Sequence, residues 1–130
     1  MNQQKRRQAL ARGVEGEAFV RRILERWGWQ VLEERWQCRW GELDLVAQEP
    51  GTSGNTLVFV EVKARGRTGA WDPRLAVTAA KQQRLWRTAE QFLIHHEALA
   101  GCPCRFDVAL VTFSAGGYRL QQYIKGAFEG

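Results

Sequence analysis

The side chains best suited by type and spacing to catalysis are Asp44 and the triplet Glu61-Val62-Lys63. In a β-strand, residues two apart face the same side, so the Glu61 carboxylate and the Lys63 ammonium would point the same way. Asp44 lies in the preceding predicted strand, and a hairpin-like turn would place it beside Glu61. A Glu/Lys pair at the end of a strand is often simply solvated, so the triplet carries weight only together with Asp44.

Grouped in this way, these residues suit a divalent cation. Two carboxylates packed together repel each other and stay ionised most easily when a cation lies between them. Mg²⁺ prefers oxygen ligands, commonly one or two carboxylates together with waters and substrate phosphate oxygens. Such an ion can polarise a phosphate and lower the pKa of a bound water, and Lys63 would orient that water or offset charge on phosphorus. We therefore expect a phosphodiester-cleaving site, which Glu17 could complete by ligating the cation or a water bound to it.

The pattern of apolar residues predicts an α/β fold with seven elements. Helical spacing predicts a first helix over residues 14–27, in which Glu17 falls close to the apolar stripe rather than opposite it. Alternating and continuous apolar runs predict strands, with a second helix between them. The predicted strands are residues 30–37, 39–48, 57–63, 106–113 and 118–124, the second helix is residues 78–96, and loops fill 49–55 and 66–73. The predicted order is α-β-β-β-α-β-β.

Length and composition indicate one domain. The chain has 130 residues, of which 45% are hydrophobic, enough for a single buried core. Residues 1–12 are polar and basic without a sustained period, so we expect a flexible basic arm followed by a single domain over 13–130. The apolar runs are too short to cross a bilayer, and no apolar stretch follows the basic start as in a secretory signal. We expect a cytoplasmic protein with no membrane partner.

The charge balance favours polyanionic partners. The formal net charge is +5, and a basic domain attracts a phosphate backbone through its field and through counterion release. Three of the six tryptophans, Trp29, Trp36 and Trp40, could stack on bases. Packing inside the domain is the favoured interpretation for any one of them.

The three cysteines, Cys38, Cys102 and Cys104, indicate reduced thiols, because their odd number and spacing fit no disulfide framework. Cys102 and Cys104 follow the pair His95-His96, which raises a zinc site as an alternative. The spacing matches no standard zinc pattern, so plain thiols are favoured.

The motifs around these residues resemble the PD-(D/E)xK nuclease superfamily, which includes Holliday-junction resolvases, and more closely the YraN-like family of small bacterial proteins. The resembling segments cover most of the chain: Gly13-x-x-Gly16-Glu17-x-Phe19, Gly41-Glu42-Leu43-Asp44-Leu45-Val46, Val58-Phe59-Val60-Glu61-Val62-Lys63-x-Arg65, Ala76-Val77 with Lys81, and Arg105-Phe106-Asp107-Val108. The Gly-Glu-x-Asp and Glu-Val-Lys-x-Arg motifs are fairly specific, and the helix matches are weaker. The chain departs from the pattern at Leu43, where proline is common, and at Arg35, Trp36 and Gln37, where Asn, Tyr and Arg are expected.

The resemblance implies a restriction-endonuclease-like αβββαβ core: a mixed central sheet flanked by two main helices, with an extra C-terminal strand. It also implies a metal site of Asp44, Glu61 and the Val62 carbonyl, holding Mg²⁺ or Mn²⁺. Lys63 would be catalytic, and Glu17 would assist.

Arg65 and Lys81 would be expected to meet phosphates. The alternative for Arg65, together with Arg67 and Arg74, is an ordinary solvated loop, as charge runs usually are. We favour a solvent-facing or supporting role for Glu42 over ligation, and capping or pairing with an arginine for Asp107. Because junction-cutting relatives act as dimers, the resemblance also points to a homodimer.

Two functions from different classes follow. The first is a metal-dependent endonuclease that hydrolyses nucleic-acid phosphodiesters, with DNA, including structured or branched DNA, as the expected partner. The alternative is a non-catalytic nucleic-acid-binding module of the same fold, for which basic charge and aromatic residues would suffice.

Overall fold

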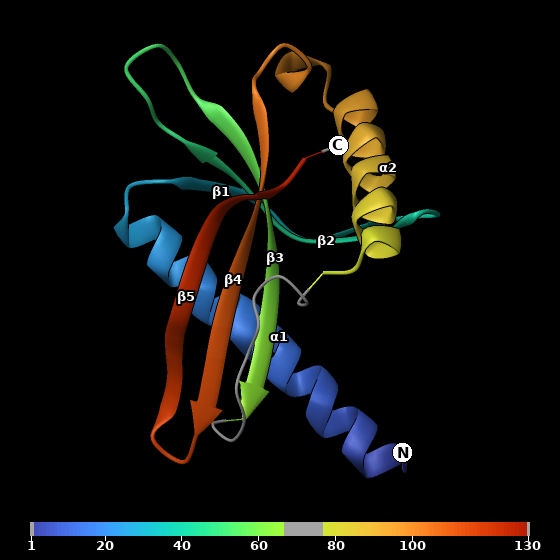
Figure 1. Ribbon diagram of the computed structural model, residues 1–130, viewed down its shortest axis with the longest axis vertical. Coiled ribbons are helices and arrows are strands. Elements are labelled where there is room, and N and C mark those ends of the chain that lie inside the picture. The colour runs from blue at the N-terminus through green and yellow to red at the C-terminus, as the bar shows by residue number, and fades with distance from the viewer. Residues whose placement is uncertain (1, 67–76, 130) are drawn as a thin grey trace.

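The chain forms the predicted series of helices and strands (Figure 1). A computed structural model describes residues 2–66 and 77–129. The elements are α1 (Gln3–Arg26), β1 (Gln30–Cys38), β2 (Gly41–Glu49), β3 (Thr56–Gly66), α2 (Ala79–His95), the short 3₁₀ helix η2 (Glu97–Leu99), β4 (Cys104–Ser114) and β5 (Gly117–Phe128). The predicted order of the seven main elements is confirmed. The predicted loop 66–73 lies, beyond Gly66, outside the described residues.

One mixed sheet holds the strands in the order β1-β2-β3-β4-β5. β3 and β4 are parallel, paired from Leu57↔Cys104 to Gly66↔Phe113, and the other neighbouring pairs are antiparallel. The connection between the two parallel strands contains α2, as a parallel pair requires. This confirms the α/β class, with a restriction-endonuclease-like αβββαβ core and β5 as the extra C-terminal strand. None of the described helices combines the length and hydropathy that a membrane span needs.

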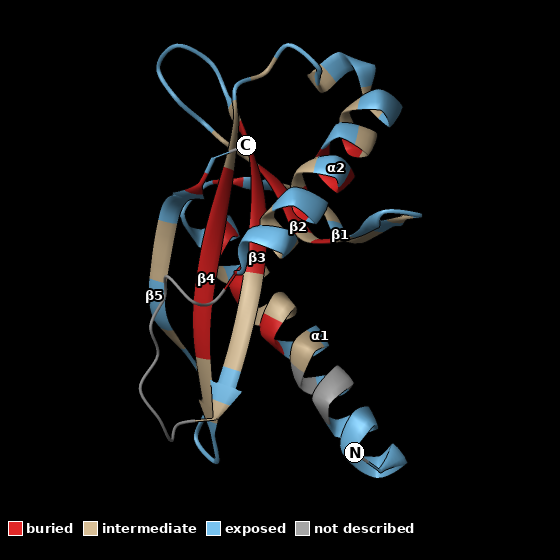
Figure 2. Ribbon diagram, turned by 45° about the vertical axis from the view of Figure 1, so that its right-hand side comes forward, coloured by how far each residue is buried: buried red, intermediate tan, exposed pale blue. Residues whose placement is uncertain are grey.

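The two helices cover opposite faces of the sheet, and alternation along the strands supplies a core to each. On the α1 side, Val20 and Leu24 pack with Leu45 and Val60. On the α2 side, Phe92 packs with neighbours that include Leu43, Phe59 and Phe106. Figure 2 shows the buried residues concentrated in the central strands and on the sheet-facing side of α2. β3 is buried on both faces over residues 57–60, as expected for a central strand covered on both sides.

Helix α1 is longer than the sequence pattern predicted. It begins at Gln3, where the Asn2 side chain accepts a hydrogen bond from the Lys5 amide, rather than near Val14. Residues 3–12 are therefore helical, and this part of α1 extends past the sheet (Figure 1). The side chains of residues 3–8 are exposed and need no apolar period, and Gln, Lys and Arg are good helix formers in water. The division of the chain at residue 12 stays a prediction.

The turn between β1 and β2 depends on Gly41. Its φ of +154° is one that side-chain-bearing residues rarely adopt, and a Cβ there would lie 3.0 Å from Thr88 Oγ1 on α2.

We expect Gly41→Ala to lower the free energy of unfolding by about 1–3 kcal/mol, as for other strained backbone positions. Chemical denaturation measures this. Gly101→Ala is the control, because a Cβ at Gly101 meets nothing within 4 Å. Equal stabilities of the two variants would contradict the prediction.

Candidate functional site

Asp44 lies where β2 and β3 separate. The regular pairing of the two strands ends at Leu45↔Val60. Two residues past Val60, the Val62 amide donates a hydrogen bond of 2.8 Å to Asp44 Oδ2. The carboxylate of Asp44 is thus fixed between the strands by the backbone of the motif that follows Glu61. A side chain that accepts a hydrogen bond from the backbone in this way is held in one position.

Three carboxylates from two elements gather at this point. Glu17 on α1 and Glu42 and Asp44 on β2 each place an oxygen so that all three lie within 4.8 Å of one another. Glu42 and Asp44 line the same pocket, although the alternation of β2 is interrupted here, since Leu43 packs on the α2 side and Leu45 on the α1 side. Glu17 reaches them because its neighbour Gly16 is buried against β3, where a Cβ would already touch Ala64. A longer side chain at position 16 would hold α1 away from the sheet. We call Glu17, Glu42 and Asp44 the acidic cluster.

Two members of the acidic cluster, Asp44 and Glu17, have raised pKa values. Burial, followed by the neighbouring charge of Glu61, raises the pKa of Asp44 to about 8, although the Val62 hydrogen bond opposes the rise. Burial, together with the charge of Glu42, raises the pKa of Glu17 to about 7 against the opposing effect of Arg35. Glu17 Oε1 is also buried without a hydrogen-bond partner. A divalent cation with oxygen ligands would supply both the positive charge and the missing partner, so these residues fit such an ion.

Arg35 contributes the protein's own positive charge to the cluster. Its Nε lies 3.7 Å from Glu17 Oε1 and 3.5 Å from Glu42 Oε1. The residue has a φ of +54°, which is uncommon for any residue other than glycine. Gln37 adds a hydrogen bond of 2.8 Å to Glu42 Oε2. Two positions that depart from the family pattern, Arg35 and Gln37, therefore hold the carboxylates of the cluster.

Glu61 faces two lysines across the site. The Glu61 side chain is buried on β3, and its Oε1 lies 2.7 Å from Lys81 Nζ and 3.5 Å from Lys63 Nζ. Burial and the neighbouring ammonium of Lys81 lower the pKa of Lys63. Burial also acts to lower the pKa of Lys81, but the hydrogen bond and charge of Glu61 outweigh it and raise the pKa. Lys81 stands in the first turn of α2, where the Thr78 side chain accepts from the Lys81 amide and so begins the helix.

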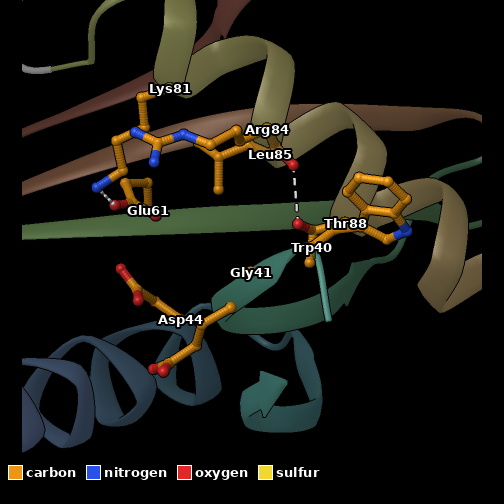
Figure 3. Close-up of a pocket in the computed structure, with 9 residues that line it drawn as sticks. Trp40, Gly41, Asp44, Glu61, Lys81, Arg84, Leu85 and Thr88 are labelled. Carbon is orange, nitrogen blue, oxygen red and sulfur yellow. Dashed lines mark hydrogen bonds and ion pairs between the residues drawn. The ribbon is translucent and has the colours of Figure 1, made fainter. Parts of the chain in front are cut away.

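A pocket of about 420 Å³ opens between the sheet and α2 at this site. Its lining residues are Trp40, Gly41, Glu42, Asp44, Glu61, Lys81, Arg84, Leu85 and Thr88. Figure 3 shows Lys81 reaching Glu61 on one side of the pocket, Asp44 on the opposite side, and the Trp40 ring near α2. The pocket thus has a carboxylate-lined side and a cationic side, with an aromatic ring beside them.

The structure brings together Glu17, Asp44, Glu61 and Lys63, the four residues predicted to be catalytic. Within the predicted metal set, Val62 contacts Asp44 through its amide, and a role for its carbonyl stays a prediction.

The two residues predicted to contact phosphate also have positions in the structure. Lys81 lines the pocket, whereas Arg65 lies exposed near the end of β3. Contact of either residue with phosphate stays a prediction. From the sequence, Glu42 was expected to have a supporting role, and Arg35 was assigned none. The period of two from Asp44 could have identified Glu42, whereas no local signal marks Arg35.

The structure also gives the surroundings of Asp107, of three tryptophans and of the cysteines. Asp107 is fully buried and accepts two hydrogen bonds from Arg105, which confirms the predicted pairing with an arginine. Trp29 is buried and Trp36 packs against the α2-side core, whereas Trp40 is exposed. The three cysteines are free thiols. Within residues 2–66 and 77–129, the acidic cluster is the one group of three or more potential ligands close enough to share an ion.

Comparison with known proteins gives consistent matches. A sequence profile described as uncharacterised protein family UPF0102 matches residues 16–111. A UPF0102 protein of Synechococcus sp. (strain JA-3-3Ab) is 53% identical over 123 residues, which span 90% of this chain and 90% of that relative. A UPF0102 protein of Gloeobacter violaceus is 49% identical over 120 residues, spanning 90% of this chain and 91% of the relative. The family description names no reaction, so the chemistry has to be argued from the site.

Proposed function

This chain belongs to the uncharacterised protein family UPF0102, which confirms its resemblance to the YraN-like proteins, and we propose that it is a metal-dependent nuclease. The observation that carries the proposal is the acidic cluster, whose buried Glu17 oxygen lacks a hydrogen-bond partner, beside the Glu61–Lys63 pair. Carboxylates kept this close and this buried are costly without a cation. The substrate we propose is a nucleic acid, with DNA first.

The division of labour follows from the geometry. Glu17, Glu42 and Asp44 would hold Mg²⁺ or Mn²⁺, with Glu61 beside them. When bound, the ion would neutralise charge on the phosphate and make a bound water more acidic. Lys63 would orient the attacking water and offset negative charge on phosphorus. Its lowered pKa means that its ammonium gives up a proton more readily than an exposed lysine does.

The cationic side of the pocket is suited to phosphates. Lys81 and Arg84 line it together with the carboxylates, so a phosphodiester between the two sides would meet opposite charge on one side and the metal on the other. Hydrolysis of a phosphodiester depends mainly on positioning and charge neutralisation, and both kinds of group are present.

The direct test is to incubate the protein with plasmid, single-stranded and four-way-junction DNA in Mg²⁺, Mn²⁺ or EDTA. We expect cleavage with metal and none with EDTA. A protein that binds neither metal and cleaves none of these substrates would contradict the proposal.

The Lys63→Ala variant tests the role of the lysine. We expect cleavage to fall by about 100-fold, at the lower end for groups that assist proton transfer or stabilise charge. Mn²⁺ binding, measured by calorimetry, should persist because Lys63 is no ligand. Lys125→Ala removes an exposed lysine that pairs with Glu49 on a separate network, and it should cleave normally. A Lys63→Ala protein with full activity would remove the lysine from the mechanism.

The ion pairs of Glu61 favour a second candidate, a non-catalytic nucleic-acid-binding module. With Lys81 at 2.7 Å, Glu61 has a positive partner without any metal. In that case the protein would bind nucleic acid with a steep salt dependence, show no cleavage with any metal, and keep its affinity in Asp44→Ala. Binding with these three properties would replace the nuclease proposal.

A further inference from the structure

Trp40 is an exposed aromatic side chain in the wall of the candidate site. It lies in the turn before β2, next to Gly41, and 41% of its surface is accessible. The same pocket is lined by Asp44 and Lys81. An exposed aromatic face beside phosphate-binding charges is the arrangement that proteins use to stack a nucleic-acid base.

Positive charge surrounds this ring. The guanidinium carbons of Arg39 and Arg87 lie 5.0 Å and 5.5 Å from its centroid. Arg84 and Lys81 line the pocket beside it. An aromatic face amid cations matches one chemical class closely: a base attached to a phosphodiester backbone, with the base on the ring and the phosphates on the cations.

We propose that Trp40 is a stacking platform for one unpaired base of the bound nucleic acid. The inference rests on the proposed function, because that function places the phosphate next to this base over Lys81, towards the acidic cluster. Bases inside an intact duplex stack on each other and cannot offer a face to Trp40 without unstacking. The site therefore selects nucleic acid with an unpaired nucleotide next to the phosphate: single strands, bulges, flaps or junctions.

The two arginines near the ring do not prevent stacking. An exposed cation–π contact stabilises by about 0.5–1 kcal/mol, whereas stacking of a base on an aromatic side chain contributes about 1–3 kcal/mol. Stacking of the base on the ring is therefore favoured over the contacts with the two arginines. Arg39, which is exposed, can turn from the ring to a phosphate, so its charge is kept in the complex.

Trp27 provides a matched control. It is 44% exposed, close to the value for Trp40, but it packs against Trp29 and Tyr123 and is not among the residues that line the pocket. Removing it takes away a similar exposed ring at another place. Trp40→Phe keeps an aromatic face, and Trp40→Ala removes it.

The test is binding, measured by fluorescence anisotropy in EDTA so that no cleavage intervenes. The probes are a labelled single-stranded DNA of about 20 nucleotides, longer than the roughly 4–16 nucleotides that one small domain covers, the same sequence as RNA, and the matching blunt duplex. We expect Trp40→Ala to weaken single-strand binding by about 5- to 100-fold and duplex binding by less than about twofold. Trp40→Phe should restore most of the loss, and Trp27→Ala should behave like the unmodified protein.

The outcomes separate the platform from the nuclease. If Trp40→Ala loses affinity for both the DNA and the RNA strand, the platform accepts any unpaired base. If it loses affinity for only one of them, that nucleic acid is the substrate. Equal losses on duplex and single strand, an equal loss in Trp27→Ala, or no loss in Trp40→Ala would overturn the inference. Binding in EDTA needs no metal. A protein that stacks bases on Trp40 but never cleaves would therefore refute the proposed nuclease activity and leave the stacking platform standing. One that cleaves but shows no effect at Trp40 would refute the platform alone.

Discussion

Replacing Asp44 by asparagine is expected to abolish metal-dependent cleavage and at the same time to stabilise the metal-free protein. Asparagine keeps the acceptor for the Val62 amide but loses the charge that a metal requires. We expect the cleavage rate to fall by about 1,000-fold or more, at the upper end for loss of one electrostatic group from an active site. Single-turnover assays at saturating Mn²⁺ would measure the loss.

The gain in stability follows from the sign of the pKa shift. The pKa of Asp44 is raised from 3.8 to about 8, so the folded protein holds this proton more tightly than the unfolded chain does. The free energy of unfolding therefore falls as the pH rises from about 4 to about 8. An asparagine side chain cannot ionise, so Asp44→Asn should be more stable by on the order of 2 kcal/mol at about pH 8, with the difference shrinking towards about pH 4.

Asp107→Asn is the control with the opposite sign. Asp107 is also shielded from water, but it accepts hydrogen bonds from Arg105, from the Tyr123 hydroxyl and from the Gly126 amide. Its replacement breaks a satisfied buried ion pair and should lower stability by about 3 kcal/mol or more. Urea denaturation in EDTA compares the two. If Asp44→Asn also destabilised the protein at about pH 8, Asp44 would be a structural carboxylate rather than one kept for a cation.

Affinity for Mn²⁺ is expected to rise steeply between about pH 6 and about pH 8. A ligand must lose its proton before it binds the ion, and Asp44 and Glu17 have pKa values of about 8 and about 7. If only Asp44 has to ionise, the affinity should rise by roughly 50-fold over this range. If Glu17 is also a ligand, the rise should be roughly 500-fold.

Calorimetry at several pH values distinguishes the two cases, and comparison of buffers with different ionisation enthalpies counts the protons released. If Glu17 is a ligand, Glu17→Gln should lower the affinity at about pH 8 as well as reduce the rise. If it is not, loss of its charge should only lower the pKa of Asp44, with little loss of affinity at that pH. Glu97→Gln changes an exposed glutamate beyond the far end of α2 and should leave the pH dependence as it was. An affinity that does not change with pH would show that the acidic cluster is not where the ion binds.

Much of this site could be predicted from local patterns. Alternation in a strand reports which side chains share a face, so Asp44, Glu61 and Lys63 could be placed on neighbouring strands from the order of residues alone. Glu17 close to the apolar stripe of a helix was a similar signal, because a carboxylate there faces towards the sheet. The same pattern failed for residues 3–12, because the exposed side chains of residues 3–8 leave no apolar period to detect.

The amino-acid sequence by itself determined the order of the elements, the neighbouring strands that carry Asp44, Glu61 and Lys63, and the family to which the chain belongs. Only the tertiary structure decided which charges meet: Lys81 with Glu61, Arg35 with Glu17 and Glu42, and Trp40 beside the site while Trp29 and Trp36 are covered. The reason is the separation along the chain of the residues involved. Alternation and helical periods arise within a few residues of chain, whereas these contacts depend on strand register, on the crossover through α2 and on how closely α1 approaches β3 at Gly16.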